Sequence, residues 1–152
     1  MKNNKGVEAL NELITINNDR IEGYKTASET TEEQELKTLF SQFVSTSQKC
    51  KLELEMEVKA LGADTTDGTK ASGKFFRVWM DVKAALTGKD REAILNSCEY
   101  GEDKAKEMYD KAIENELEYL TPQQKNMVVA QKSLLKKDHD HIKSLVNALE
   151  KA

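Results

Sequence analysis

Two acidic residues and a histidine in the second half of the sequence have the chemistry of metal ligands. Asp138 and His141 form an Asp-x-x-His sequence, a spacing that places a carboxylate and an imidazole on one face of a helix. Glu102, in the preceding helical segment, could supply a further carboxylate. Oxygen and imidazole donors of this kind suit iron or manganese. Glu102, Asp138 and His141 are therefore a candidate site for a single metal ion.

A complete di-iron site is not expected, because half of its ligands are missing. Such a site in a four-helix bundle needs a Glu from each of two helices and a Glu-x-x-His from each of the other two. The first helical segment has Asn17 where a Glu would be needed, and the second offers Ser47 and Cys50 without a histidine. Glu53 and Glu57 lie one to two turns further along. No Gly-rich phosphate loop and no pair of nucleophile and base is recognisable, so no catalytic or cofactor-binding residue is assigned.

Four long amphipathic helices are predicted to carry these residues. Apolar side chains recur at spacings of three and four in the segments 6–27, 31–61, 90–116 and 121–152. Capping-box pairs mark two of the helix starts, Thr31 with Gln34 and Thr121 with Gln124, and Asp90 is a candidate cap for a third. Gly62 is the expected left-handed stop after the second helix.

Each predicted helix has a polar residue near the middle of its apolar face. These residues are Asn17, Ser47, Glu102 and Asp138. In one bundle they would meet as a buried polar layer, which must be hydrogen-bonded or hold an ion. The favoured interpretation is a water-linked layer that fixes the helix register, with no metal. Glu102 and Asp138 cannot both be buried and charged without a cation, so one would hold a proton or lean out into solvent.

A long connection, about residues 62–89, separates the two pairs of helices. It contains the turn dipeptide Asp67-Gly68 and a predicted short helix at 75–86. Phe76 and Met80 lie off the apolar stripe of that short helix. They are either packed by a curved docking or exposed as a contact patch for a second copy or a protein partner.

Composition excludes several classes of protein. The 152 residues suit one domain, residues 1–152, and the net charge of −4 with a pI of about 5.4 argues against nucleic acid as a partner. No apolar run is long enough to span a bilayer, and the N-terminal residues lack the apolar stretch of a signal peptide. The two cysteines, Cys50 and Cys98, are too few for a disulfide framework, so a cytoplasmic location is expected.

The order of the predicted elements is long, long, crossover with a short helix, long, long. This order predicts an all-α fold, the ferritin-like four-helix bundle built from two antiparallel hairpins. The chain also resembles the bacterial ferritin-like family labelled domain of unknown function 2383. The segments that carry the resemblance are Leu10-Asn11-Glu12-Leu13-Ile14, Asp19, Tyr24, Gly62, Trp79, Lys83-Ala84-Ala85-Leu86-Thr87-Gly88-Lys89-Asp90, Cys98-Glu99-Tyr100-Gly101-Glu102-Asp103, Tyr109 and His139-Asp140-His141-Ile142-Lys143.

The resemblance implies the bundle fold and no particular activity. It picks out Asp19, Tyr24, Glu99 and His139 as polar residues, whereas the helical projection favours Asn17 and His141. The expected function is a non-catalytic bundle of the bacterial cytoplasm, stress-related or partner-binding. The alternative is a metal-binding protein with an incomplete iron or manganese site, and a carrier of apolar ligands is a third possibility that requires a cavity.

Overall fold

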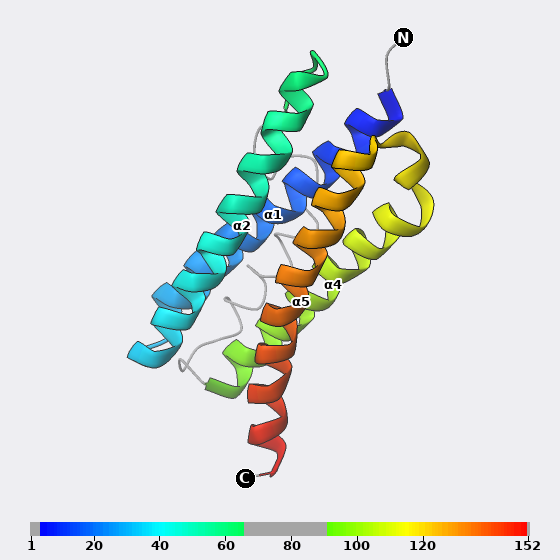
Figure 1. The fold of residues 1–152 in the computed structure, drawn as a ribbon. Helices are drawn as coiled ribbons and strands as arrows, with labels where there is room; N and C mark the ends of the chain where they lie inside the picture. Colours follow the sequence, from blue (N-terminus) through cyan, green and yellow to red (C-terminus); the bar gives the residue numbers. More distant parts are fainter. Residues whose placement is uncertain (1–3, 66–90, 152) are drawn as a thin grey trace.

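Four long helices account for most of the chain in a computed structural model, which describes residues 4–65 and 91–151. They are α1 (Asn4–Thr30), α2 (Gln34–Ala60), α4 (Arg91–Asn115) and α5 (Pro122–Lys151) (Figure 1). A single 3-10 turn, η2 (Leu117–Tyr119), which the sequence did not predict, lies in the connection between α4 and α5. The four predicted long helices are confirmed, with ends that differ by a few residues.

The helices form two antiparallel hairpins. α1 packs along α2 and α4 packs along α5, while α1 also contacts α4 and α2 contacts α5. An ion pair between Arg91 and Glu33 places the start of α4 beside the start of α2, so these two helices run in the same direction (Figure 1). The end of α2 and the start of α4 therefore lie at opposite ends of the bundle, as the predicted crossover requires.

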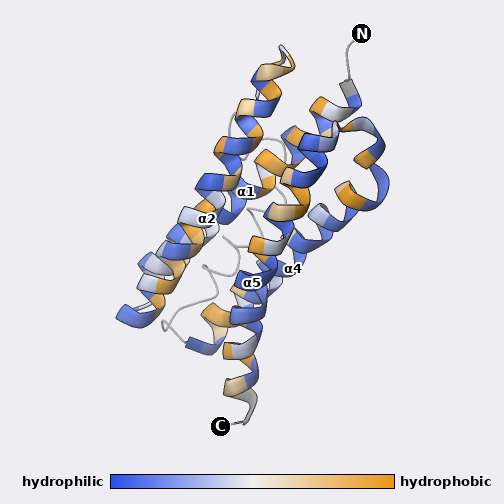
Figure 2. Ribbon diagram, in the orientation of Figure 1, coloured by the Kyte–Doolittle hydropathy of each residue, from blue (hydrophilic) through white to orange (hydrophobic). Residues whose placement is uncertain are grey.

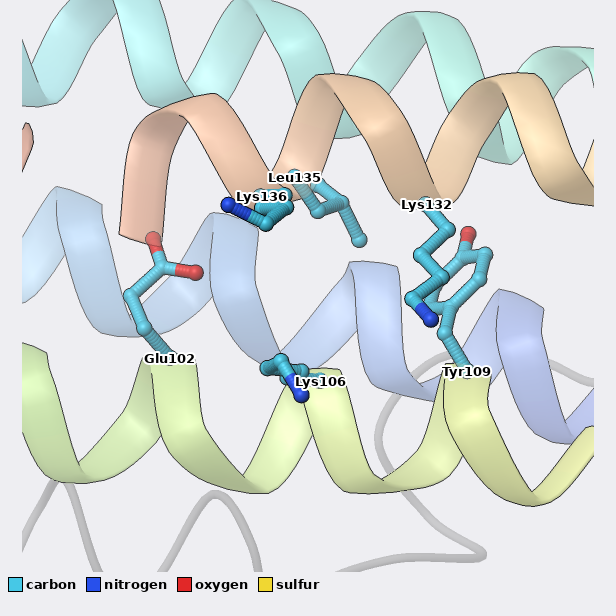
Figure 3. A pocket seen from close by; sticks show the side chains of 6 residues that line it. All are labelled: Glu102, Lys106, Tyr109, Lys132, Leu135 and Lys136. Carbon is cyan, nitrogen blue, oxygen red and sulfur yellow. The ribbon is translucent and has the colours of Figure 1, made fainter. Parts of the chain in front are cut away.

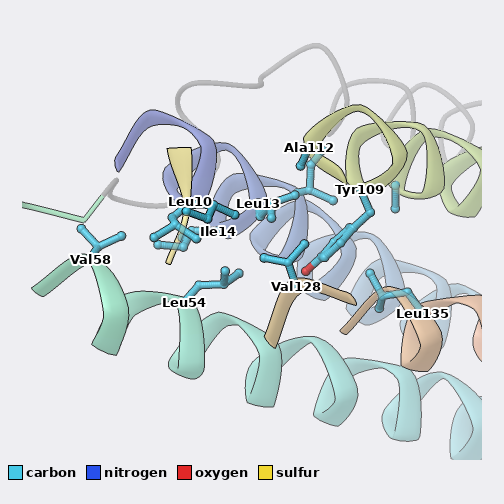
Figure 4. Packing of buried hydrophobic residues seen from close by; sticks show 12 residues of the cluster. Leu10, Leu13, Ile14, Leu54, Val58, Tyr109, Ala112, Val128 and Leu135 are labelled. Atoms are coloured by element: carbon cyan, nitrogen blue, oxygen red, sulfur yellow. The ribbon is translucent and has the colours of Figure 1, made fainter. Parts of the chain in front are cut away.

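The hydrophobic core is divided into two halves along the bundle. One half gathers side chains from the start of α1, the end of α2, the end of α4 and the start of α5, including Leu10, Leu54, Tyr109 and Val128 (Figure 4). The other half gathers residues from the opposite ends of the same helices, including Phe40. Hydrophilic and hydrophobic residues alternate along each helix, as amphipathic packing requires (Figure 2). The polar residues described below lie between the two halves.

Helix ends agree with the local sequence signals at two of the three predicted positions that lie in the described residues. Gly62 has a φ of 77°, the left-handed conformation that glycine adopts without steric cost after a helix. Thr121 and Gln124 form a reciprocal capping box: the Gln124 amide donates to Thr121 Oγ1, and the Thr121 amide donates to Gln124 Oε1, both at 3.1 Å. Thr31 and Gln34 do not form one, because α2 begins after Glu33, and Thr31 Oγ1 accepts the Glu33 amide instead.

The inner face of α5 is rotated from the predicted one. The apolar spacing in this segment predicts an inner stripe of Met127, Leu134, Leu135, Ile142, Leu145 and Leu149. Val128, Gln131 and Val146 are buried, although this stripe does not include them. Met127 and Leu134, which it did include, are only partly buried. The projection missed this rotation because apolar residues lie on both sides of the inner face of α5, and only the neighbouring helices decide which side is covered.

The predicted short helix at 75–86, with Phe76 and Met80, lies outside the described residues, as does Asp90. The contact patch expected there stays a prediction.

Replacing Thr121 by Ala should lower the free energy of unfolding by about 1 kcal/mol, because the α5 capping box loses the hydroxyl that accepts an amide of the first turn. Urea denaturation followed by circular dichroism measures this difference. Thr121→Ser is the matched control, since it keeps the accepting oxygen. Equal losses in both variants would show that the cap does not stabilise the helix.

Candidate functional site

The centre of the bundle is occupied by the side chain of Arg20, which is completely buried. Its guanidinium extends from α1 and bonds to a residue on each of the other three helices. Nη1 donates to Ser47 Oγ on α2, while Nη2 donates to Glu102 Oε2 on α4 at 2.6 Å and to Asp138 Oδ2 on α5 at 3.2 Å. We call Arg20, Ser47, Glu102 and Asp138 the Arg20 layer.

Tyr24, one turn after Arg20 on α1, completes the surroundings of this layer. Its hydroxyl donates to Glu102 Oε2, the same oxygen that accepts from Arg20. The Arg20 guanidinium carbon lies 5.3 Å from the centre of the Tyr24 ring, within the range of a cation–π interaction. Glu102 is therefore held by two donors from one helix.

Three of the four residues predicted to form the polar layer meet around Arg20, and the fourth lies beside them. Ser47 and Glu102 are buried, and the Asp138 side chain is 13% exposed at the edge. Asn17 is also buried but belongs to a separate network. The sequence did not identify Arg20 as a member of the layer.

The network around Asn17 also joins all four helices. Asn17 Nδ2 on α1 donates to the Tyr109 hydroxyl on α4 at 2.9 Å, and this hydroxyl donates to Gln131 Oε1 on α5 at 2.7 Å. Gln131 Nε2 in turn donates to the Cys50 carbonyl oxygen and to Glu53 Oε1 on α2. Two polar layers, each with a member from every helix, therefore lie next to one another in the bundle.

The two histidines do not take part in either layer. His141 is exposed, and its ring packs edge-on against Phe43, with 6.1 Å between the ring centres. His139 bridges α5 to α4, because its Nε2 lies 2.7 Å from Asp103 Oδ1. Glu99 pairs at the surface with Lys143, at 3.8 Å, and Asp19 is buried on α1.

The Arg20 layer contains one positive and two negative side chains. Burial alone would lower the pKa of Arg20, but its interactions with Glu102, Tyr24 and Asp138 together outweigh this effect and raise the pKa, so the guanidinium stays protonated. Burial raises the pKa of Asp138 to about 6, although Arg20 opposes the shift. Burial and the neighbouring Glu102 also raise the pKa of Tyr24, so the phenol stays a hydrogen-bond donor.

The two cysteines lie near these layers and are both buried as free thiols. Burial raises the pKa of Cys50 to about 11 and also raises that of Cys98. Thiols are reactive nucleophiles and metal ligands only as thiolates, so neither residue is in a reactive state at neutral pH.

These residues do not fit the metal site expected from the sequence. Glu102 and Asp138 converge as predicted, but a guanidinium lies between them, and His141 is exposed and packs against Phe43 instead. In the part of the chain that the structure describes, no three His, Cys, Asp or Glu side chains are arranged so that they could hold a metal ion. The cation that the two carboxylates require is supplied by the protein itself.

The fold is that of the ferritin-like four-helix bundles. A mutant of Dps1 from Mycobacterium smegmatis superimposes with a TM-score of 0.81 over 95% of this chain and 96% of its own, at 17% sequence identity. A two-domain protein from Anabaena variabilis, with DJ-1/ThiJ/PfpI-like and ferritin-like domains, gives a TM-score of 0.75 over 97% of this chain and 40% of its own, at 20% identity. No curated protein matches the sequence.

The family model described as domain of unknown function (DUF2383) matches residues 5–115. The chain belongs to this family, as its sequence predicted. The match includes Arg20, Tyr24, Ser47 and Glu102, and it ends before Asp138.

Replacing Arg20 by Met should lower the free energy of unfolding by roughly 3–5 kcal/mol at pH 7, because the carboxylates of Glu102 and Asp138 lose the guanidinium that pairs with both. The loss should be smaller at pH 5, where the Asp138 carboxylate, with its raised pKa of about 6, can take up a proton. Denaturant unfolding at both pH values measures this. Arg20→Lys is the matched control and should lose less at pH 7. A loss that does not depend on pH would show that packing, not charge, explains the effect.

Replacing Asp138 by Asn should remove part of the pH dependence of stability. Because the pKa of Asp138 rises from 3.8 to about 6 on folding, the folded protein binds this proton more tightly. Its contribution is complete below about pH 4 and is lost as the pH rises through 6, a change of up to about 3 kcal/mol. Asp138→Asn should thus be more stable than the wild type at pH 7.5 and similar to it at pH 4.5. The free energy of unfolding of both proteins is measured from pH 4.5 to pH 7.5. The same dependence on pH in both would contradict a raised pKa at Asp138.

Proposed function

We propose that this protein is a non-catalytic ferritin-like bundle, in which Arg20 takes the place that a metal ion would need. The observation that supports this most directly is the pair of bonds from Arg20 Nη2 to Glu102 and Asp138. A metal ion between these carboxylates would be repelled by the guanidinium at contact distance. Arginine remains charged throughout the physiological pH range, so this cation cannot be lost by deprotonation.

A guanidinium does not replace the chemistry of a metal. It has no vacant coordination position for a substrate or oxygen, and it does not change oxidation state at the potentials used in biology. Its five N–H groups instead act as fixed donors, here to Ser47, Glu102 and Asp138. In such a bundle the buried polar residues stabilise the fold, and any binding function belongs to the surface.

A role in binding a partner, or a second copy of the chain, follows from this proposal. Leu52 and Met56 on α2 are 59% and 63% exposed, and their spacing of four places them together on one outer face. Phe76 and Met80 are further candidates for such a surface from the sequence. The similarity in fold to Dps1 is compatible with an oligomer.

A stress-related role, a bacterial cytoplasmic location and a single domain over 1–152 belong to the same proposal. None of the described helices has the length and hydrophobicity needed to cross a membrane.

Elemental analysis of protein purified without chelator tests whether the bundle binds a metal ion. We expect iron and manganese far below one ion per chain and no change in melting temperature when ferrous or manganous ion is added, since a bound ion would stabilise the folded state by mass action. Glu102→Gln is the control for any metal that is found. Near-stoichiometric metal that disappears in this variant would favour the rival, an iron- or manganese-binding protein.

Size-exclusion chromatography with light scattering tests the surface role. We expect a mass above the 17.2 kDa of one chain at high concentration, or capture of a partner in a pull-down. The double variant Leu52→Ser and Met56→Ser should reduce this association. Val129→Ser, which alters an exposed apolar residue on α5, is the matched control. A strict monomer without any partner would count against a surface function.

A further inference from the structure

A small pocket lies between α4 and α5 next to the Arg20 layer. Its lining consists of Glu102, Lys106, Tyr109, Lys132, Leu135 and Lys136 (Figure 3). The carboxylate of Glu102 stands at one end of the pocket and the ring of Tyr109 at the other, with Leu135 above and between them in this view. The space suffices for about one water molecule.

Glu102 brings an unsatisfied hydrogen-bond acceptor to this pocket. Its Oε2 accepts from both Arg20 and Tyr24, but within the described part of the chain its Oε1 has no hydrogen-bond partner. The side chain is only 1% exposed. A buried carboxylate oxygen without a donor is unfavourable, so a donor is expected in the adjoining space.

The lysines that line the pocket restrict the nature of that donor. Lys106 and Lys132 both pair with Asp110, with Nζ to oxygen distances of 3.0 and 2.6 Å, and Lys136 pairs with Asp140 at 2.7 Å. These carboxylates keep the ammonium groups near the surface. The three ammonium groups disfavour a cation in the pocket, and the Glu102 carboxylate disfavours an anion there. A neutral molecule that both donates and accepts satisfies both conditions.

We propose that this pocket binds one buried water molecule that donates a hydrogen bond to Glu102 Oε1. The same water accepts a hydrogen bond from a lysine ammonium at the mouth. It supplies the donor that the Arg20 layer lacks, and it links the excess negative charge of that layer to the positive rim. This inference rests on the geometry of Glu102 and does not depend on the proposed function.

A high-resolution crystal structure together with water–protein cross-relaxation in solution tests the proposal. We expect density for one water within hydrogen-bond distance of Glu102 Oε1, and cross-peaks of the sign of a long-lived bound water at the Leu135 methyl groups. A pocket without density and without cross-peaks would overturn the proposal. So would a lysine Nζ bonded directly to Oε1.

Leu135→Phe provides a second test, because the larger ring should fill the pocket and expel the water. The folding equilibrium constant should then fall about tenfold or more, since Glu102 Oε1 loses its donor. In a Glu102→Gln background the same substitution should cost clearly less, because a neutral amide is less costly to leave without a partner than a charged carboxylate oxygen. Equal losses in the two backgrounds would contradict a water bound to Glu102, whatever the protein's function.

Discussion

A buried guanidinium that must be neutralised is the constraint on which the rest of this bundle depends. Arg20 cannot leave its charge in the core unpaired, and it finds its partners on three different helices. Those bonds can form together only if α2, α4 and α5 are placed correctly around α1. Hydrophobic packing alone is not directional, so the Arg20 layer adds a requirement for one arrangement of the four helices. The Asn17 network repeats this requirement about one turn away along α1.

The same constraint explains why the interior is poorly suited to metal chemistry. In a bundle that binds metal, inward carboxylates are neutralised by the ion, whereas here two of them are neutralised by an arginine of the same chain. The layer still has one more negative than positive side chain. Two features at the edge of the layer reduce the cost of this extra charge. Asp138 is partly exposed and has a raised pKa, and lysines line the pocket beside Glu102.

Most of the fold could be predicted from the sequence, and about half of the site. The periodic apolar residues and the Thr121 cap gave the helices, and Ser47, Glu102 and Asp138 were expected to face inward, as they do. Arg20 was missed because arginine is normally assigned to the surface. The available signal was its position seven residues after Leu13 and seven before Ala27, both buried on the same face of α1. His141, a candidate ligand in the sequence, is exposed in the structure, because the rotation of α5 depends on packing between helices.

The most direct test of the central claim is a crystal structure of the protein soaked in manganous ion, with anomalous diffraction to locate the metal. We expect continuous density from the Arg20 guanidinium to both Glu102 and Asp138, without an anomalous peak between the two carboxylates. A manganese peak between Glu102 and Asp138, with the Arg20 side chain turned away from them, would contradict it.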